Sequence, residues 1–335
     1  MRVARCLLSG KCVARYAKNM TIQQIYELAV NMGVKADLRG REKVKKYLEL
    51  AKKKYEKLDK EQKQEFDKEK LTNPYSDTRI LVDNKNKEIK KILAGIDMEG
   101  SELLLADKMG DIDLVISHHP RGKALADLHS VMDLQAQVLA DYGVPINIAE
   151  SVLRPRISEV NRGMSPINHN RPVDMAKLLK LNYMCVHTPA DNLGADFLVK
   201  LIEKKKPEFV EDVLKMLKEI LEYKEAVKLN AGPALFTGRP ENSCGKVVVT
   251  EFTGGTSGAK EIYEKMANAG IGTIIGMHMR EEHRKEAEKY HLNVVIAGHM
   301  ASDSLGMNLF LDELEKKGIE AVPCSGLIRI KRFGK

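Results

Sequence analysis

The sequence contains no tryptophan, and aromatic residues make up only 5% of its 335 positions. Proteins that bind single-stranded nucleic acid without sequence preference stack the bases on aromatic side chains, so this scarcity argues against such a surface. Long apolar runs are also absent, because none approaches the roughly 18 residues that a membrane span needs. The sequence therefore predicts a protein that does not span a membrane.

Cysteine is scarce as well, with five residues at positions 6, 12, 185, 244 and 324. Their odd number and wide spacing argue against a disulfide framework and are typical of a reducing compartment, so we predict a cytoplasmic protein. The absence of clustered thiols also argues against a structural zinc knot. A metal site in this protein would therefore use other ligands.

The formal net charge is +8, and much of the excess lies in one segment. Residues 39–70 contain 13 Lys or Arg and 8 Asp or Glu, on a helical pattern with apolar residues at steps of three and four. We predict that residues 1–75 form a basic N-terminal helical extension, with Thr21 as the N-cap of its first helix. The segment 39–70 is either a solvated hairpin that packs by one apolar stripe or a surface for nucleic acid or another anionic partner.

The first 19 residues hold five basic side chains and no acidic one. This composition is typical of a targeting peptide. It is also expected of an upstream stretch read from an early start codon, in which case Met20 begins the patterned sequence. We favour the second interpretation, and the sequence leaves both open.

After residue 76 the pattern changes to short apolar runs that alternate with helical segments. This alternation predicts an α/β fold of mixed, mostly parallel sheets with helices on both faces. We expect a first part over 76–240 and a second over 241–335. Strands are expected near 92–96, 112–116, 144–148, 183–186, 246–251, 272–277, 294–297 and 327–331. The Pro-rich stretch 150–172 predicts a long loop, and 231–243 predicts a connection.

Histidine and aspartate follow three of these strands. The run DIDLVISHHP ends a buried strand with His118 and His119, and Pro120 forces the chain to turn. Consecutive side chains on extended backbone point to opposite sides, so the two imidazoles are better placed to serve two adjacent ions than to clasp one. The other two strands end in HTPAD, at 187–191, and GHMASD, at 298–303.

Ligands of open α/β sheets bind in the crevice outside the carboxyl ends of the strands, so the three motifs could meet in one place. Imidazole nitrogens combined with carboxylate oxygens suit zinc, iron or manganese. The sequence therefore predicts a site for divalent metal ions at which both parts of the chain meet.

In this order and at these wide intervals, SHHP, HTPAD and GHMASD resemble the signature of the NGG-interacting-factor-three-like proteins, also known as type-two GTP cyclohydrolase I homologues. The motif GID at 95–97 fits the same pattern, and the resemblance covers roughly residues 80–331. It implies two metal ions, a hexameric ring and a ring-opening reaction on GTP. The metal ligands that it implies are His118, His119, Asp191, His299 and Asp303.

Two departures from the family pattern concern this site. Asp303 stands where the family usually has glutamate, which is one methylene longer, so metal spacing or occupancy could differ. The stretch 121–171 does not match the usual lining residues, so substrate choice could differ too. Among further residues, His278 and His283 could line the cavity, and His129 and His169 could also contribute. The turn GGTSG at 254–258 is either a phosphate cradle or a tight strand-to-helix turn.

Two metal ions held close together can activate water and polarise a phosphoryl or carbonyl oxygen. We therefore expect a metal-dependent hydrolase that acts on a phosphoester or nucleotide-like small molecule, with His187 and His278 as proton-transferring residues. The alternative is a non-catalytic metal-binding or regulatory protein whose helical extension binds nucleic acid or protein.

Overall fold

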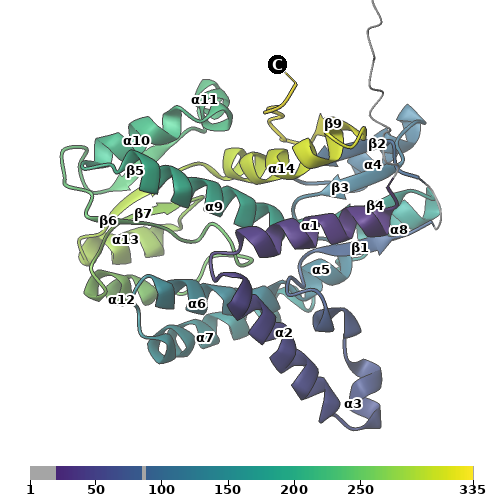
Figure 1. Ribbon diagram of the computed structural model, residues 1–335, viewed down its shortest axis with the longest axis horizontal. Coiled ribbons are helices and arrows are strands. Elements are labelled where there is room, and N and C mark those ends of the chain that lie inside the picture. The colour runs from purple at the N-terminus through teal and green to yellow at the C-terminus, as the bar shows by residue number, and fades with distance from the viewer. Residues whose placement is uncertain (1–19, 85–87, 335) are drawn as a thin grey trace, which may run out of the picture.

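The computed structural model describes residues 20–84 and 88–334. The prediction for residues 1–19, including Cys6 and Cys12, lies outside the described residues. Within the described part, the chain alternates between strands and helices after a helical N-terminal region (Figure 1). Its strands form a five-stranded and a four-stranded sheet.

The five-stranded sheet has the order β1-β4-β3-β2-β9. Its strands are β1 (Arg79–Val82), β4 (Asn182–Cys185), β3 (Leu114–Ser117), β2 (Lys91–Gly95) and β9 (Glu320–Cys324). Only β1 runs antiparallel to its neighbour. Every residue of β3 and β4 is buried, as expected for short apolar strands covered on both faces.

The four-stranded sheet has the order β5-β8-β7-β6. Its strands are β5 (Ala234–Thr237), β8 (Asn293–Ile296), β7 (Ile271–Gly276) and β6 (Lys246–Val249). Here β5 alone is antiparallel. The predicted mostly parallel α/β fold is therefore confirmed. Two strands do not follow the predicted division at residue 240: β9, from the second part of the chain, belongs to the five-stranded sheet, and β5, from the first part, belongs to the four-stranded sheet.

Three helices run side by side between the sheets: α1 (Ile22–Ala36), α9 (Thr188–Lys205) and α14 (His299–Glu315) (Figure 1). A Cβ atom on Gly306 of α14 would lie 2.2 Å from the carbonyl oxygen of Ala190 on α9, so only glycine permits this approach. The close packing fixes the N-terminal ends of α9 and α14 relative to each other. These ends carry two of the three predicted motifs.

The remaining helices flank the sheets or connect their strands (Figure 1). They are α4 (Gly100–Met109), α5 (Gly122–Ala126), α6 (Asp133–Asp141), α7 (Ile146–Met164), α8 (Arg171–Leu178), α10 (Val210–Lys218), α11 (Leu221–Lys228), α12 (Ile262–Asn268) and α13 (Glu281–Lys289), with 3-10 helices at Lys68–Leu71 and Leu128–Met132. Among the described residues, no helix has the length and apolar character needed to cross a membrane.

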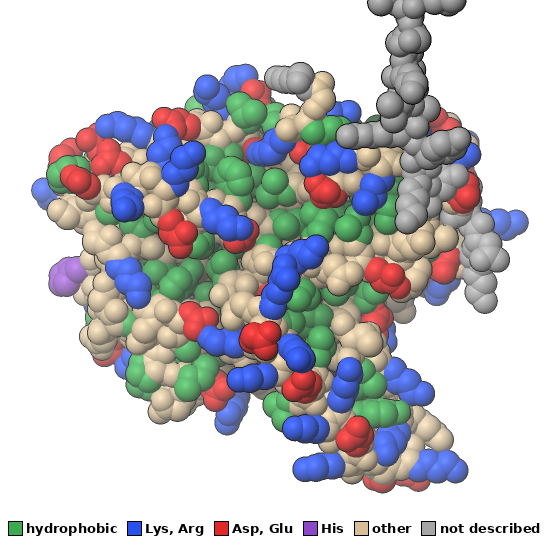
Figure 2. All heavy atoms as spheres, viewed as in Figure 1, with side chains coloured by type: hydrophobic (Ala, Val, Ile, Leu, Met, Phe, Trp, Pro, Cys, Tyr) green, Lys and Arg blue, Asp and Glu red, His purple; other side chains and the backbone are tan. Residues whose placement is uncertain are grey.

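The N-terminal region consists of the buried helix α1 and an arm formed by α2 (Arg41–Glu56) and α3 (Lys60–Glu65). Thr21 caps α1 with a capping box, as predicted. The arm projects from the body, and Figure 2 shows many Lys and Arg side chains on it. The fully buried Arg79 of β1 pairs with Asp67 and Glu69, so the end of the arm is fixed to the first sheet.

Two sequence predictions between residues 144 and 172 are wrong. The expected strand at 144–148 and most of the expected loop at 150–172 are instead helix α7, which contains Pro155 in its interior. Proline removes a backbone hydrogen bond from a helix, and this cost led us to predict a loop. Buried residues of α7, including Ala149 and Leu153, pack in an apolar cluster with Leu139 of α6, which offsets the loss.

Two further predictions concern edge strands. The expected strand at 327–331 is wrong, and the edge strand is β9, whose Pro323 is tolerated because an edge strand leaves one side unpaired. The expected connection at 231–243 contains β5, an edge strand that exposes Ala234 and Phe236. Edge strands lack the continuous apolar pattern of buried ones, so periodicity did not detect them.

Candidate metal centre

Three strand ends bring the predicted motifs together. His118 and His119 follow β3, His187 follows β4 and leads into α9, and His299 follows β8 and begins α14. On α9 and α14, Asp191 and Asp303 lie four residues after these histidines. Gly298 connects β8 to α14 at φ +105°, where a Cβ atom would lie 2.6 Å from the Ala231 carbonyl oxygen. The backbone at this turn therefore requires glycine.

Asp303 lies at the centre of the cluster, and its side chain is 1% exposed. Its Oδ1 is 3.5 Å from Nε2 of His118, while its Oδ2 is 3.3 Å from Nε2 of His119 and 3.5 Å from Nε2 of His299. Oδ1 of Asp191 is 3.3 Å from the same Nε2 of His118. The two oxygens of this carboxylate thus face different imidazole nitrogens.

Among the residues that the structure describes, three groups of side chains are close enough to hold a metal ion, with ligand atoms within 4.8 Å of one another. They are His118 with Asp191 and Asp303, His119 with His299 and Asp303, and His118 with His119 and His187. The donors fit a cation, because four buried polar atoms here make no hydrogen bond. These atoms are Nε2 of His118, Oδ1 of Asp191 and both carboxylate oxygens of Asp303. Unpaired buried polar atoms are costly, so each requires a partner.

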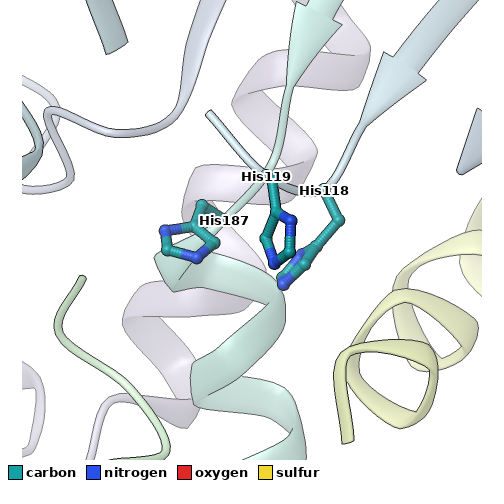
Figure 3. Close-up of side chains that lie close together, drawn as sticks. All are labelled: His118, His119 and His187. Atoms are coloured by element: carbon teal, nitrogen blue, oxygen red, sulfur yellow. The ribbon is translucent and has the colours of Figure 1, made fainter. Parts of the chain in front are cut away.

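Neighbouring acceptors hold the imidazoles of His118 and His119, whose rings lie close to each other and to His187 (Figure 3). Nδ1 of His118 lies 3.0 Å from the carbonyl oxygen of Val186, and Nδ1 of His119 lies 2.9 Å from Asp97 Oδ1. Arg121 donates to the same oxygen of Asp97 at 2.8 Å. When Nδ1 carries the proton, the lone pair of Nε2 is free to bind a metal ion, which is the arrangement that metal-binding histidines use.

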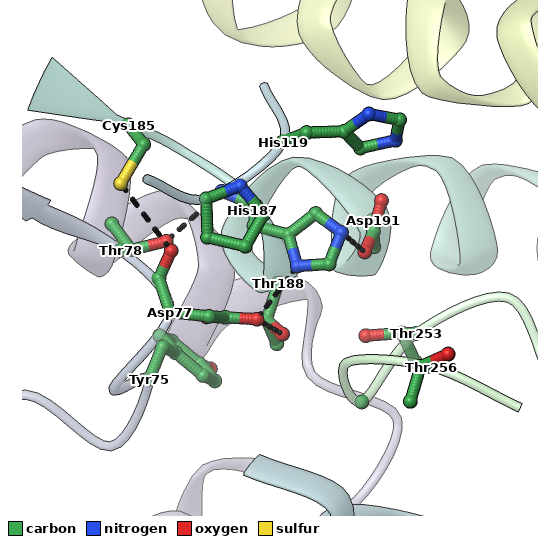
Figure 4. Close-up of polar contacts among 12 residues, drawn as sticks. Tyr75, Asp77, Thr78, His119, Cys185, His187, Thr188, Asp191, Thr253 and Thr256 are labelled. Atoms are coloured by element: carbon green, nitrogen blue, oxygen red, sulfur yellow. Dashed lines mark hydrogen bonds and ion pairs between the residues drawn. The ribbon is translucent and has the colours of Figure 1, made fainter. Parts of the chain in front are cut away.

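His187 is held in the same way by Asp77 (Figure 4). Nδ1 of His187 lies 2.8 Å from Asp77 Oδ2, which also accepts a hydrogen bond from the Thr188 hydroxyl at 2.6 Å. The opposite ring nitrogen of His187 lies 3.7 Å from Oδ2 of Asp191. His187 can therefore either join the metal-binding group or exchange protons at Nε2.

The charges of the cluster determine its titration in the absence of metal. Burial lowers the pKa of His118, but the carboxylates of Asp303 and Asp191 outweigh it, and the net pKa is well above the usual value. Burial raises the pKa of Asp303, but His118 and the neighbouring histidines lower it below its usual range. Burial lowers the pKa of His299 to about 4. Without metal, a proton on His118 thus balances the negative charge of the two carboxylates, as a bound cation would.

The cluster opens into a cavity of about 30 Å³, which holds one or two water-sized molecules. Its lining consists of His187, Asp191, His299 and Asp303, together with Met277, His278 and residues of the loop 251–256. The ring of His278 lies 4.7 Å from that of His299, centroid to centroid. Figure 4 shows Thr253 and Thr256 on the loop across from Asp191.

Three of the predicted histidines lie elsewhere. His129 is 3.9 Å from Asp127, and His169 is 3.2 Å from the carbonyl oxygen of Met164. His283 is buried against Tyr263, outside the residues that line the metal cavity. The GGTSG turn does not lead directly into a helix, because α12 begins at Ile262; its Gly255 and Thr256 line the cavity.

Sequence reasoning missed three acidic residues of this region. Asp97 belongs to the GID motif at the end of β2, which was a usable signal. Asp77 precedes β1, a strand of four residues that the apolar pattern did not reveal. Glu251 lines the cavity just after β6, and nothing in its sequence context distinguished it from a surface residue.

No family model matches the chain, and no curated protein matches it. A solved structure titled as a NIF3 (NGG-interacting-factor-three) superfamily protein from Sphaerobacter thermophilus has 22% sequence identity and a TM-score of 0.75, and covers 92% of this chain and 99% of that chain. This likeness shows that the chain has the NIF3 fold, so the fold implied by the motif resemblance is confirmed.

Two other solved structures have lower scores. Reduced HcgD from Methanocaldococcus jannaschii is 18% identical with a TM-score of 0.48, covering 73% of this chain and 87% of that one. TTHA1606 from Thermus thermophilus is 14% identical with a TM-score of 0.39, covering 74% and 87%.

Proposed function

We propose that this chain is a metal-dependent hydrolase with a dinuclear centre. The proposed metal ligands are His118, His119, Asp191, His299 and Asp303. The observation that carries the proposal is the position of Asp303, whose two oxygens face separate donor sets 3.3 to 3.5 Å away and have no hydrogen-bond partner. A carboxylate in this position is suited to bridging two cations.

The donor set of imidazole and carboxylate is suited to zinc, iron or manganese. Two such ions, when bound, lower the pKa of water and stabilise charge that develops on a phosphoryl or carbonyl oxygen. The chain itself orients the imidazoles through Asp97 and the Val186 carbonyl group, and it limits the cavity to a few waters. His187, oriented by Asp77, and His278, which also lines the cavity, are placed to transfer protons.

The proposed substrate is a phosphoester or a nucleotide-like small molecule, hydrolysed at a P–O bond or at a C–N bond of the ring. The motif resemblance supports a type-two GTP cyclohydrolase-like reaction, a hexameric assembly and a cytoplasmic location, and each belongs to the proposal. The small cavity supports a reaction in which only the reacting group of the substrate reaches the centre.

The test is turnover by purified protein, stripped of metal and then loaded with zinc, iron or manganese, on a panel of phosphoesters and GTP. We expect turnover only with metal, and a loss of at least about 100-fold in His118→Ala and Asp303→Ala. Asp174→Ala, an exposed acidic residue on α8, is the matched control. Full metal loading without turnover on any substrate would contradict the proposal.

The arm formed by α2 and α3 supports a second candidate function, a metal-binding regulatory protein that engages nucleic acid. Lys45, Lys52 and Lys53 are exposed on α2. Binding to a duplex or single-stranded oligonucleotide should weaken steeply with salt. Changing these three lysines to glutamine should reduce the slope of the logarithm of the binding constant against the logarithm of salt concentration by about 3. Binding that does not depend on salt or on these lysines would exclude this function for the arm.

A further inference from the structure

A buried carboxylate belongs to the lining of the cavity beside the candidate metal centre. Glu251 follows β6, and its side chain is only 7% exposed. It lines the same cavity as His187, His299 and Asp303, yet it belongs to none of the groups that the described part of the chain offers to a metal ion. Its role is therefore separate from that of the candidate ligands.

The backbone at Glu251 has φ +53°, in the left-handed region that glycine usually occupies. A side chain with a Cβ atom adopts this conformation only at an energetic cost, and such residues concentrate at functional sites. The glutamate thus stands at a position where glycine would adopt the backbone conformation without this cost.

Two side chains fix one oxygen of the carboxylate and leave the other free. The hydroxyl of Tyr263 donates to Oε1 at 3.1 Å, and Nδ1 of His283 lies 3.4 Å from the same oxygen. Burial and the neighbouring Glu251 raise the pKa of Tyr263 well above its usual value, so the phenol stays a donor. Oε2 of Glu251 is buried and has no hydrogen-bond partner.

His283 connects this carboxylate to a second and larger space. It lines a cavity of about 570 Å³ between α7 and α13, together with Arg156 and Arg280. Glu251 lines the small cavity and His283 the large one, and they contact each other. A proton received at Glu251 therefore has a route away from the centre that avoids the candidate ligands.

We propose that Glu251 is the proton acceptor of the hydrolysis assigned to this site, and that Tyr263 and His283 are its positioning residues. This inference rests on the proposed function. The carboxylate of Glu251 takes a proton from a water molecule in the cavity while the water oxygen forms a bond to the phosphorus or carbon of the substrate. The bond between this phosphorus or carbon and the leaving group breaks, and its electron pair stays on the leaving group. The leaving group receives a proton from Glu251 or His278.

Other titratable groups face the cavity and must be separated from Glu251 in any experiment. They are His187 and Asp191 from α9, His299 and Asp303 from α14, and His278 after β7, with Tyr263 from α12 and His283 from α13 behind the carboxylate. A substitution confined to Glu251 that leaves metal content unchanged distinguishes it from these groups.

The primary test compares metal-loaded wild type with Glu251→Gln on a phosphoester that the wild type hydrolyses. We expect kcat to fall about 100- to 10,000-fold, with KM and metal content within about twofold of wild type. Glu264→Gln serves as the matched control, because Glu264 lies on the same helix as Tyr263, has a side chain that is 40% exposed, and pairs with Lys265. Equal kcat in Glu251→Gln and wild type would overturn the inference.

Restoring turnover with added formate distinguishes the loss of a reacting carboxylate from the loss of folded protein. In Glu251→Ala, sodium formate should restore turnover at least tenfold, because formate can occupy the vacated carboxylate position, whereas formate should not restore His118→Ala. His283→Gln should lower kcat by about tenfold at unchanged KM, and equal melting temperatures would show that each variant is folded. Absence of formate rescue together with unchanged kcat in His283→Gln would contradict the assignment.

The same experiment distinguishes this inference from the proposed function. If wild type turns over substrate with metal and His118→Ala does not, the proposed function stands, and Glu251→Gln alone decides the inference. If wild type hydrolyses no substrate on the panel, both fail together.

Discussion

Asp77 and His187, 110 residues apart in sequence, form a buried pair in which Asp77 Oδ2 lies 2.8 Å from Nδ1 of the imidazole. Asp77 precedes the edge strand β1, and His187 follows the neighbouring strand β4. The pairing fixes the proton on Nδ1 and presents Nε2 to the cavity, as carboxylate partners do for catalytic and metal-binding histidines.

Changing Asp77 to asparagine tests this pairing. Asparagine can donate to Nδ1 and so favours the wrong tautomer, and we expect turnover by the metal-loaded protein to fall about 100-fold or more. Asp174→Asn, exposed on α8, should leave turnover within about twofold. Steady-state kinetics provides the measurement, and an unchanged rate in Asp77→Asn would show that His187 needs no fixed tautomer.

Metal removal should destabilise the protein, because ions that bind only the folded state add to its free energy of unfolding. At a free metal concentration of 100 times Kd the gain is about 3 kcal/mol. We expect a chelator to lower the melting temperature of wild type and to leave that of Asp303→Ala unchanged. Identical melting curves of wild type with metal and with chelator would contradict a structural contribution from bound ions.

The metal-free protein should lose stability as the pH falls from about 6.5 toward 4. Burial lowers the pKa of His299 to about 4, below the roughly 6.5 of an unfolded histidine. Between these values the unfolded chain binds the extra proton, so this contribution is present above pH 6.5 and lost as the pH falls through the folded pKa.

Urea unfolding of wild type and His299→Gln at pH 7 and pH 4.5 measures this contribution. Glutamine does not titrate, so the stability difference between the two proteins should move in favour of the variant at pH 4.5. A constant difference at both values would show that His299 titrates normally.

Substituting Glu251 by glycine should stabilise the protein while removing its proposed role. Glycine adopts φ +53° without strain, which is worth roughly 1 kcal/mol, and the change also removes a buried oxygen without a partner. Tyr263 keeps His283 as a hydrogen-bond partner at 3.3 Å. We expect the free energy of unfolding to rise by about 1 kcal/mol in denaturant titrations.

Lys206→Gly provides the matched control, because Lys206 has φ +49° at the exposed C-terminus of α9. It reports the backbone contribution alone, about 0.4–1 kcal/mol. A destabilised Glu251→Gly beside a stabilised Lys206→Gly would mean that the glutamate side chain is needed for packing.

The candidate site was largely predictable because its residues follow buried strands. Short apolar runs identified β3, β4 and β8, and the rule that ligands bind at the carboxyl ends of parallel strands placed His118, His187 and His299 near one another. Asp303 could be added because it lies four residues after His299 in a helix. The rest of the environment depends on long-range contacts that periodicity does not encode.

Asp77 and Glu251 illustrate what the sequence could not reveal. Asp77 reaches His187 only because β1 pairs antiparallel with β4, and β1 is an edge strand with two half-buried residues, unlike the fully buried β3 and β4. Glu251 lines the cavity at a residue with a positive φ, and neither feature is encoded in the residue type. The helix α7 was missed for a related reason, since tertiary packing of Leu153 offsets the local cost of Pro155.

The most direct test of the central claim is the number of metal ions bound per chain, measured by elemental analysis of protein that has been loaded and then freed of excess metal. We predict two ions in wild type and in Asp174→Ala, and fewer than one in Asp303→Ala, because Asp303 is shared by both donor sets. Wild type without bound metal, or Asp303→Ala with two ions, would contradict the account.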